Sequence, residues 1–111
     1  MVEEIYMFKN ESFSDFIEYA SNEIIKIDNI EEAFNKLSYI ITKYYRNSSI
    51  RFAEKFGKRM SYIAGSGNKM FIEAEKIKLS DKYFVFLENF TFNSEKEKDN
   101  FILLLKKVTS I

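Results

Sequence analysis

The chain has 111 residues and contains neither cysteine nor histidine. These two absences exclude a disulfide framework, metal sites built from Cys or His ligands, thiol nucleophiles and catalytic triads that use imidazole as their base. The only glycines, Gly57, Gly65 and Gly67, do not have the spacing of a Walker A loop or of a dinucleotide fingerprint. Composition therefore excludes most common enzyme chemistries, and we predict a binding module without catalytic residues or a cofactor.

Long hydrophobic runs are missing as well. No apolar segment approaches the roughly 20 residues that cross a bilayer, and the acidic start at Glu3 and Glu4 differs from the basic start of a secretory signal. We therefore expect a cytoplasmic protein with no membrane partner. Apolar residues still make up 46% of the chain, which is enough to form a core. The length predicts a single domain that spans residues 1–111.

The formal net charge is zero, but the charges are unevenly distributed. Residues 1–40 contain nine acidic and three basic residues, a difference of −6, whereas residues 41–70 contain one acidic and seven basic residues, a difference of +6. The second block includes all three arginines, Arg46, Arg51 and Arg59. A neutral total argues against a nucleic-acid partner, but this local cationic region makes such a partner a candidate.

Hydrophobic periodicity and capping residues predict the secondary structure. Strands are expected at residues 2–8, 23–28 and 82–88, where apolar residues form short runs. Helices are expected at 12–20, after the cap Asn29, from about 48 to 64, after the glycine breaker at 65–67, and after the cap Ser94. This alternation predicts an α/β fold in which a small mixed β-sheet is covered by about five helices, as a single-domain sandwich.

The expected helix at 48–64 carries the sharpest functional feature. Its spacing would place four cations and one tyrosine on one helix face: Arg51, Lys55, Lys58, Arg59 and Tyr62. Clustered Lys and Arg attract phosphates, and a neighbouring Tyr can stack on an unpaired base. These five residues are therefore candidates for nucleic-acid contact, although a solvated helix face is the commoner explanation of a basic stripe.

The segment 62–74 predicts two helices joined by a glycine turn. Such a turn exposes backbone N–H groups at the start of the second helix, and these suit an anion or the carboxylate of a partner. On these grounds alone, a plain helical hairpin whose glycines only turn the corner is the better explanation.

Carboxylates do not form a recognisable active site. The adjacent pairs Glu3–Glu4 and Glu31–Glu32 point apart on any regular element. An oxygen-ligand magnesium site built from scattered acidic residues stays open, but no spacing indicates one. We therefore predict no metal site.

The stretch from Met60 to Leu87 resembles the small accessory subunit of the KEOPS (EKC) complex, the PRPK-binding protein family. That family has an apolar helix end, an Ala/Ser–Gly turn, a basic–Gln–Ile run with an alanine three residues later, and then a short loop and an apolar strand. The matching residues are 63–67 for the turn, Lys69, Phe71 and Ala74 for the run, 80–82 for the loop and 83–87 for the strand. Met70 and Leu79 depart from the family, which usually has Gln at the first position and often Gly at the second.

The resemblance implies a regulatory subunit without catalytic residues, cofactor or small-molecule substrate. Members of the family dock on the small lobe of an atypical kinase/ATPase subunit and bind the single-stranded 3′ CCA end of tRNA. The assembly makes the threonylcarbamoyl modification of adenosine in tRNAs that decode ANN codons. By position, the resemblance assigns kinase docking to Gly65, Ser66, Gly67, Lys69, Met70 and Phe71. The charge pattern, rather than the family, leads us to assign tRNA contact to Arg51, Lys55, Lys58, Arg59 and Tyr62.

Two other classes of function stay open beside this leading hypothesis. One is a protein–protein interaction module whose basic face meets an acidic partner, which would give salt-sensitive protein binding without tRNA binding. The other is a small enzyme that uses carboxylates and a bound metal, which would show metal-dependent turnover.

Overall fold

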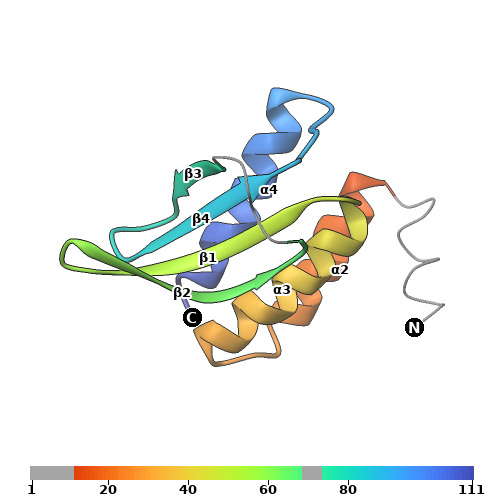
Figure 1. Cartoon of the computed structure of the whole chain (residues 1–111). Coiled ribbons are helices and arrows are strands. Elements are labelled where there is room, and N and C mark those ends of the chain that lie inside the picture. Colours follow the sequence, from red (N-terminus) through yellow and green to blue (C-terminus); the bar gives the residue numbers. More distant parts are fainter. Residues whose placement is uncertain (1–11, 69–73) are drawn as a thin grey trace.

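The computed structural model describes residues 12–68 and 74–111. Within these ranges the chain forms three helices and four strands (Figure 1). In chain order they are α2 (Phe13–Ile24), α3 (Ile30–Tyr44), β1 (Ser49–Phe56), β2 (Arg59–Ser66), β3 (Glu75–Lys78), β4 (Tyr83–Glu88) and α4 (Glu95–Val108). No helix within the described ranges combines the length and the apolar character that a membrane span requires.

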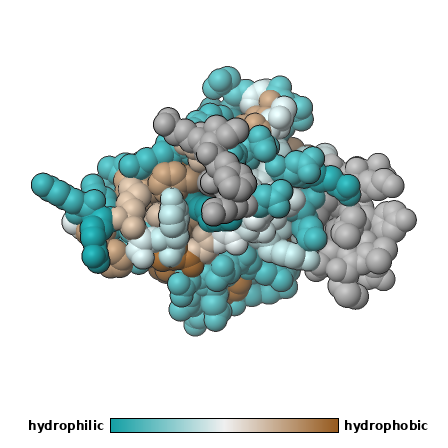
Figure 2. Space-filling view, in the orientation of Figure 1, coloured by the Kyte–Doolittle hydropathy of each residue, from teal (hydrophilic) through white to brown (hydrophobic). Residues whose placement is uncertain are grey.

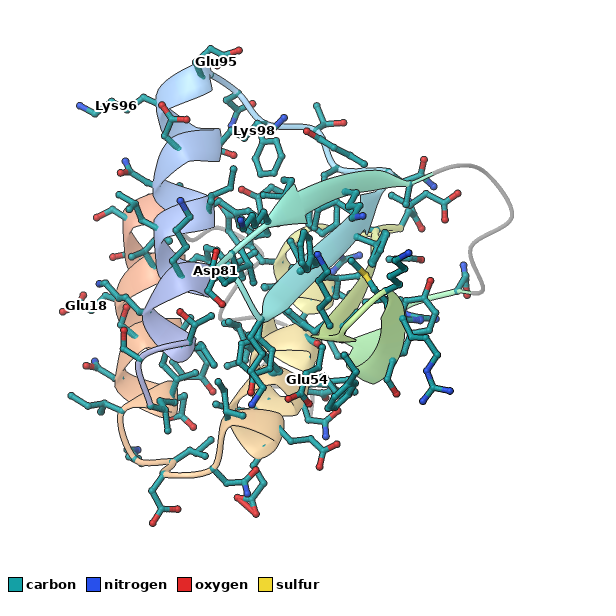
Figure 3. All side chains as sticks on the ribbon, turned by 90° about the vertical axis from the view of Figure 1, so that its left-hand side faces the viewer. Glu18, Glu54, Asp81, Glu95, Lys96 and Lys98 are labelled. Carbon is teal, nitrogen blue, oxygen red and sulfur yellow. The ribbon has the colours of Figure 1, made fainter. Side chains whose placement is uncertain are left out.

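The four strands form one sheet in the order β2-β1-β4-β3, and every neighbouring pair is antiparallel. α3 packs on β2 and β1, and α2 contacts both α3 and α4. Figure 3 shows this arrangement from the side, with α2 and α4 at the left and the strands at the right. The described part of the chain therefore has two layers, and its helices leave the other side of the sheet uncovered.

The helices begin where capping side chains satisfy their first backbone N–H groups. Ser12 and Asp15 form a capping box at α2, in which the Ser12 hydroxyl accepts from the Asp15 N–H at 3.2 Å. Asn29 and Ser94 each accept the N–H three residues later, at 2.9 and 3.0 Å. These contacts confirm the helix starts that the sequence predicts at Ser12, Asn29 and Ser94.

The core between helices and sheet is rich in aromatic rings. Phe34 of α3 stacks on Phe52 of β1 with ring centroids 4.1 Å apart, and Tyr83 of β4 meets Phe34 edge-on at 5.6 Å. Phe34 and Phe52 are fully buried. Because rings that stack this closely leave no room for sliding, the contact fixes α3 over the centre of the sheet.

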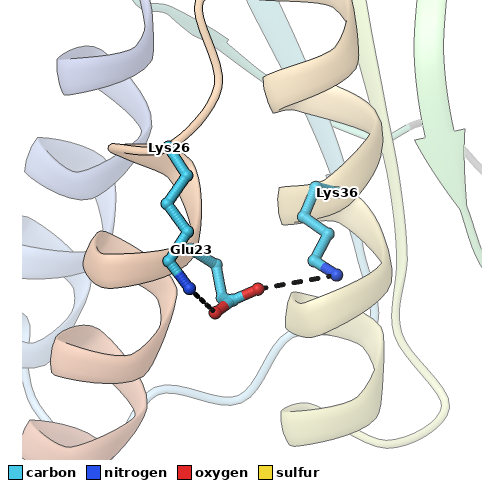
Figure 4. A network of polar contacts seen from close by, with 3 residues as sticks. All are labelled: Glu23, Lys26 and Lys36. Atoms are coloured by element: carbon cyan, nitrogen blue, oxygen red, sulfur yellow. Dashed lines mark hydrogen bonds and ion pairs between the residues drawn. The ribbon is translucent and has the colours of Figure 1, made fainter.

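A polar contact joins the two N-terminal helices at the surface. The carboxylate of Glu23, in the last turn of α2, lies 3.2 Å from Lys26 Nζ and 3.6 Å from Lys36 Nζ of α3 (Figure 4). Exposed ion pairs of this kind contribute only about 0–1 kcal/mol. The contact therefore helps to orient α2 against α3 but adds little to the stability of the domain.

The expected fold, a small mixed sheet covered by about five helices, is wrong. The described residues form three helices, and their sheet is antiparallel throughout. The largest error concerns residues 48–64, expected as one helix, which form the hairpin of β1 and β2 instead. What holds is coarser: this is a small domain that combines helices with a sheet.

Two local features explain why this segment forms a hairpin. Ile50 and Phe52 are fully buried on the helix side of β1, and the residue between them points away, as alternation in a strand requires. Gly57 has a φ of 61° and begins the two-residue loop between the paired residues Phe56 and Arg59. A glycine at this first loop position, where φ is positive, is typical of a type II′ hairpin turn.

The other expected elements have mixed outcomes. The strand at 82–88 is confirmed as β4, whereas the strand expected at 23–28 is wrong, because α2 continues to Ile24 and a turn follows. Ile24 lies four residues after Ala20 and extends the buried stripe of α2. The strand expected at 2–8 lies outside the described residues. So do residues 69–73 of the helix expected after the glycine turn, and residues 75–78 of that segment form β3.

Candidate nucleic-acid interface

The side of the sheet opposite the helices forms a surface of aromatic and cationic residues, which we call the open face. Residues that pair directly across antiparallel strands point to the same side of a sheet. From β3 to β2, one row consists of Lys76, Phe86, Arg51 and Gly65, the next row consists of Lys78, Phe84, Ala53 and Tyr62, and Lys55 and Met60 form a third, shorter row.

Aromatic rings occupy the centre of the open face. Tyr62 is 68% exposed, and its ring meets Phe86 edge-on with centroids 5.7 Å apart. Ala53 lies on β1, the strand between these two residues, and is fully buried. Next to them, Lys76 Nζ lies 5.0 Å from the ring centroid of Phe84. Phe84 is only 8% exposed and Phe86 is half-buried, so Tyr62 is the ring of this group that stands largely in water.

Cations surround these rings. Lys76 and Lys78 lie on the edge strand β3, Lys55 lies on β1, and Lys58 lies in the β1–β2 turn. Lys78 Nζ is 3.1 Å from Asp81, but both side chains are exposed, so this pair is weak. The four amines therefore give the open face a positive potential on two sides of its aromatic centre.

The hydropathy of the surface agrees with this arrangement. Figure 2 views the sheet from its open side and shows tan and brown apolar atoms over the strands. Teal hydrophilic atoms lie at the left, where the β1–β2 turn extends from the sheet in Figure 1. An apolar patch bordered by charge marks a surface suited to binding.

Arg51 lies across the open face in a fixed position. Its Nη1 donates to the carbonyl oxygens of Ile50 and Ser66, both at 2.8 Å, and its Nη2 donates to that of Asn68 at 3.4 Å. A Cβ on Gly65 would lie 2.6 Å from Arg51 Cδ, so only glycine leaves room for this side chain. Arg51 is therefore largely committed to the protein's own backbone, although its charge still contributes to the face.

The structure brings together only part of the predicted nucleic-acid contact set. Arg51, Lys55 and Tyr62 share the open face, but on two strands rather than on one helix. Lys58 lies in the turn, and Arg59 pairs with Phe56, so that its side chain points to the other side of the hairpin. The prediction that these five residues lie on one helix is therefore wrong. Three of them nevertheless share one surface of the sheet.

The predicted docking set is not a helical corner. Gly65 and Ser66 belong to strand β2, and Gly67 follows the strand with a φ of 102°. Lys69, Met70 and Phe71 lie outside the described residues. Because Gly65 accommodates Arg51 within the chain, its lack of a side chain has an internal reason.

The lysines and phenylalanines that β3 and β4 contribute to the open face were not predicted as site residues from the sequence: Lys76, Lys78, Phe84 and Phe86. The two Phe residues were expected inside a buried strand, because the run from Tyr83 to Leu87 is apolar without interruption. Phe84 is buried as expected, whereas Phe86 is half-buried. The alternation of lysines at 76 and 78 was a usable signal, since residues two apart lie on one side of a strand.

A buried polar cluster lies at the other end of the core. Tyr45 donates a hydrogen bond to Glu97 at 2.8 Å, and Asn93 donates to the second carboxylate oxygen at 3.2 Å. Burial, followed by the hydrogen bond to Glu97, raises the pKa of Tyr45 well above its usual value. Both Glu97 oxygens have partners within the protein, so this cluster is structural in character.

Among the described residues, the hollows at the end of α3 and the acidic side chains do not combine into a metal site. Two adjoining hollows of about 380 and 280 Å³ lie at the end of α3 and share the lining residues Thr42, Lys43 and Asn47. Neither has an acidic residue among its described lining. In the part of the chain that the structure covers, no group of three or more acidic residues is close enough to hold a metal ion.

Comparison with known proteins places the chain in no family. No family model, no curated protein and no solved structure matches it. The open face of the sheet is therefore the principal guide to function.

Proposed function

We propose that this protein is a non-catalytic module that binds nucleic acid on the open face of its sheet. The observation that carries the proposal is the combination on one surface of exposed lysines with an aromatic centre. Lysines release counterions when they neutralise phosphates, and this gives affinity without a catalytic group.

The arrangement of the charges favours an extended anion. Lys55 lies on β1, whereas Lys76 and Lys78 lie on β3, with β4 between the two strands. Neighbouring strands are about 4.8 Å apart, so the amines are spaced across roughly 10–15 Å. A single small anion cannot contact all of them, whereas successive phosphates of a strand can.

The finer proposal is that the ligand is the unpaired 3′ end of tRNA and that the protein serves as an accessory subunit of a KEOPS-like complex. Its support is the resemblance over residues 60–87, together with an open face suited to RNA. Docking on a kinase/ATPase subunit is proposed for the segment around Ser66 and Gly67. Pull-down from the native host tests this part, and recovery of neither a kinase-like subunit nor tRNA would contradict it.

The general proposal is tested by neutralising lysines. The triple variant Lys55→Gln, Lys58→Gln, Lys76→Gln removes two cations of the open face and one from the turn beside it. Its matched control changes Lys96, Lys106 and Lys107, which are exposed on α4, to Gln. Single strands give a slope of about −0.7 per phosphate contact in log affinity against log salt. We expect the slope of the first variant to become shallower by about 2 and that of the control to stay unchanged, measured by fluorescence anisotropy.

The alternative function is binding of an acidic protein partner. It predicts that both sets of variants leave tRNA affinity equally weak or undetectable, while the native partner binds in a salt-sensitive way that needs Lys55, Lys58 and Lys76. Equal slopes for the wild type and the first triple variant would contradict the nucleic-acid proposal.

A further inference from the structure

Tyr62 has an exposure that the fold does not explain. It is a large aromatic side chain, 68% exposed, on a sheet surface where no described helix packs. Its neighbour Phe86 contacts the ring edge-on, with centroids 5.7 Å apart. Among the described residues, the ring therefore has an aromatic support and enough exposed surface to stack on a further flat group.

The cations beside Tyr62 indicate which flat group it would take. Lys78 lies in the same row as Tyr62, Lys55 lies in the next row, and Lys76 lies over Phe84. A ligand that covers Tyr62 therefore brings its charged part close to several amines. A nucleobase joined to phosphates has this combination of a planar, apolar face and adjacent negative charge.

The same geometry discriminates between single and double strands. In a duplex, the faces of the bases are already stacked on their neighbours, so a protruding Tyr reaches only the backbone and groove edges. An unpaired base can turn its face toward the protein, and stacking on an aromatic ring changes affinity by about 5- to 150-fold per base.

We infer that the open face selects unpaired segments of nucleic acid by stacking at least one base on Tyr62, supported by Phe86, while Lys55, Lys76 and Lys78 hold the flanking phosphates. This inference rests on the proposed nucleic-acid function and adds which side chains would recognise an unpaired strand. It assigns Tyr62 to base contact and the lysines to backbone contact.

The absence of tryptophan from the chain provides a direct test. Tyr62→Trp places the only indole of the protein at the proposed stacking position, and Tyr39→Trp places it instead on α3, where Tyr39 is 42% exposed. Each variant is titrated with an unlabelled single strand of about eight nucleotides and with a duplex of the same length. We expect the single strand to quench the indole fluorescence of Tyr62→Trp, the duplex to leave it unchanged, and the Tyr39→Trp control to bind without quenching.

Affinity variants complete the test. Tyr62→Ala lowers single-strand affinity by about 5- to 150-fold, Tyr62→Phe keeps affinity near that of the wild type, and Tyr39→Ala has no effect. Circular dichroism checks the fold of each variant.

The outcomes separate the two proposals. Salt-dependent binding without quenching of Tyr62→Trp, or equal affinity for single strand and duplex, overturns the stacking inference and leaves phosphate binding by the lysines intact. Failure to bind any nucleic acid overturns the proposed function as well. The indole fluorescence gives an answer even if Tyr62→Ala does not fold.

Discussion

Gly65→Ala tests how the open face is held together. An added Cβ would lie 2.6 Å from Arg51 Cδ and 2.7 Å from the carbonyl oxygen of Ile50. Both distances are well inside ordinary contact, so the chain must move. The Arg51 side chain is flexible, but moving it breaks its hydrogen bonds to the backbone carbonyls of Ile50 and Ser66. The Ile50 carbonyl belongs to the paired strand β1 and has less freedom.

The magnitude of the loss follows from these two contacts. Overpacking costs about 1–3 kcal/mol, and hydrogen bonds to charged groups contribute about 1.5–3 kcal/mol. Because moving Arg51 relieves part of the clash, the two costs overlap, and we expect a loss of about 2–4 kcal/mol in the free energy of unfolding. With a urea m-value of about 1.5 kcal/mol/M, the midpoint falls by about 1–3 M.

Urea unfolding followed by circular dichroism measures this loss, and a second background isolates its cause. In the Arg51→Ala background, the Cβ added by Gly65→Ala no longer clashes with the Arg51 side chain. The loss in free energy of unfolding caused by Gly65→Ala therefore becomes smaller by about 0.5 kcal/mol or more. A Gly65→Ala protein whose stability stays within about 0.5 kcal/mol of the wild type, or costs that add without interaction, would refute this explanation.

Two further predictions concern the core. Tyr45 has a raised pKa because it is buried and donates a hydrogen bond to Glu97. Below about pH 10 its hydroxyl keeps the proton in both the folded and the unfolded chain, whereas above that pH the unfolded chain loses the proton first. The free energy of unfolding therefore falls by about 1.4 kcal/mol per pH unit for this residue. Urea unfolding between about pH 9 and pH 11 should show a shallower decline in Tyr45→Phe, and identical slopes would contradict the assignment. Phe34→Ala removes a fully buried ring stacked on Phe52 at 4.1 Å, and thermal and urea unfolding should show a loss of about 3–5 kcal/mol. A loss below about 1 kcal/mol would mean that this stack does not hold α3 in place.

The helices could be predicted because their signals are local. Ser12, Asn29 and Ser94 cap helices whose apolar residues recur at helical spacing, and α2, α3 and α4 begin where those caps stand. Strand β4 was predicted from a continuous apolar run, which also needs only neighbouring residues.

The hairpin could not be predicted in the same way, because the same residues satisfy both periods. Phe52 and Phe56 are four residues apart, which fits one face of a helix as well as one side of a strand. The pairing of β1 with β4, a strand far along the chain, favours the strand over the helix. A local sequence pattern does not contain this information.

The spacing of four residues also explains why part of the predicted nucleic-acid contact set shares one surface, although the helix expected at 48–64 is a hairpin. Arg51 and Lys55 are four residues apart, so they share a side on a strand as on a helix. The turn at Gly57 then changes the phase: Tyr62 returns to the open face, whereas Arg59 points away from it. Phe84 and Phe86 could not be placed on that face without knowing which side the helices cover.

The central claim, that the open face binds single-stranded nucleic acid, is tested most directly by mapping amide chemical shifts during titration with a short single-stranded RNA. We predict that the largest changes fall on residues of the sheet, including Lys55, Tyr62, Lys76 and Phe86, and that the exposed side of α4 around Leu103 stays unchanged. Changes confined to α2 and α4, or no changes at RNA concentrations that saturate binding in solution, would contradict the claim.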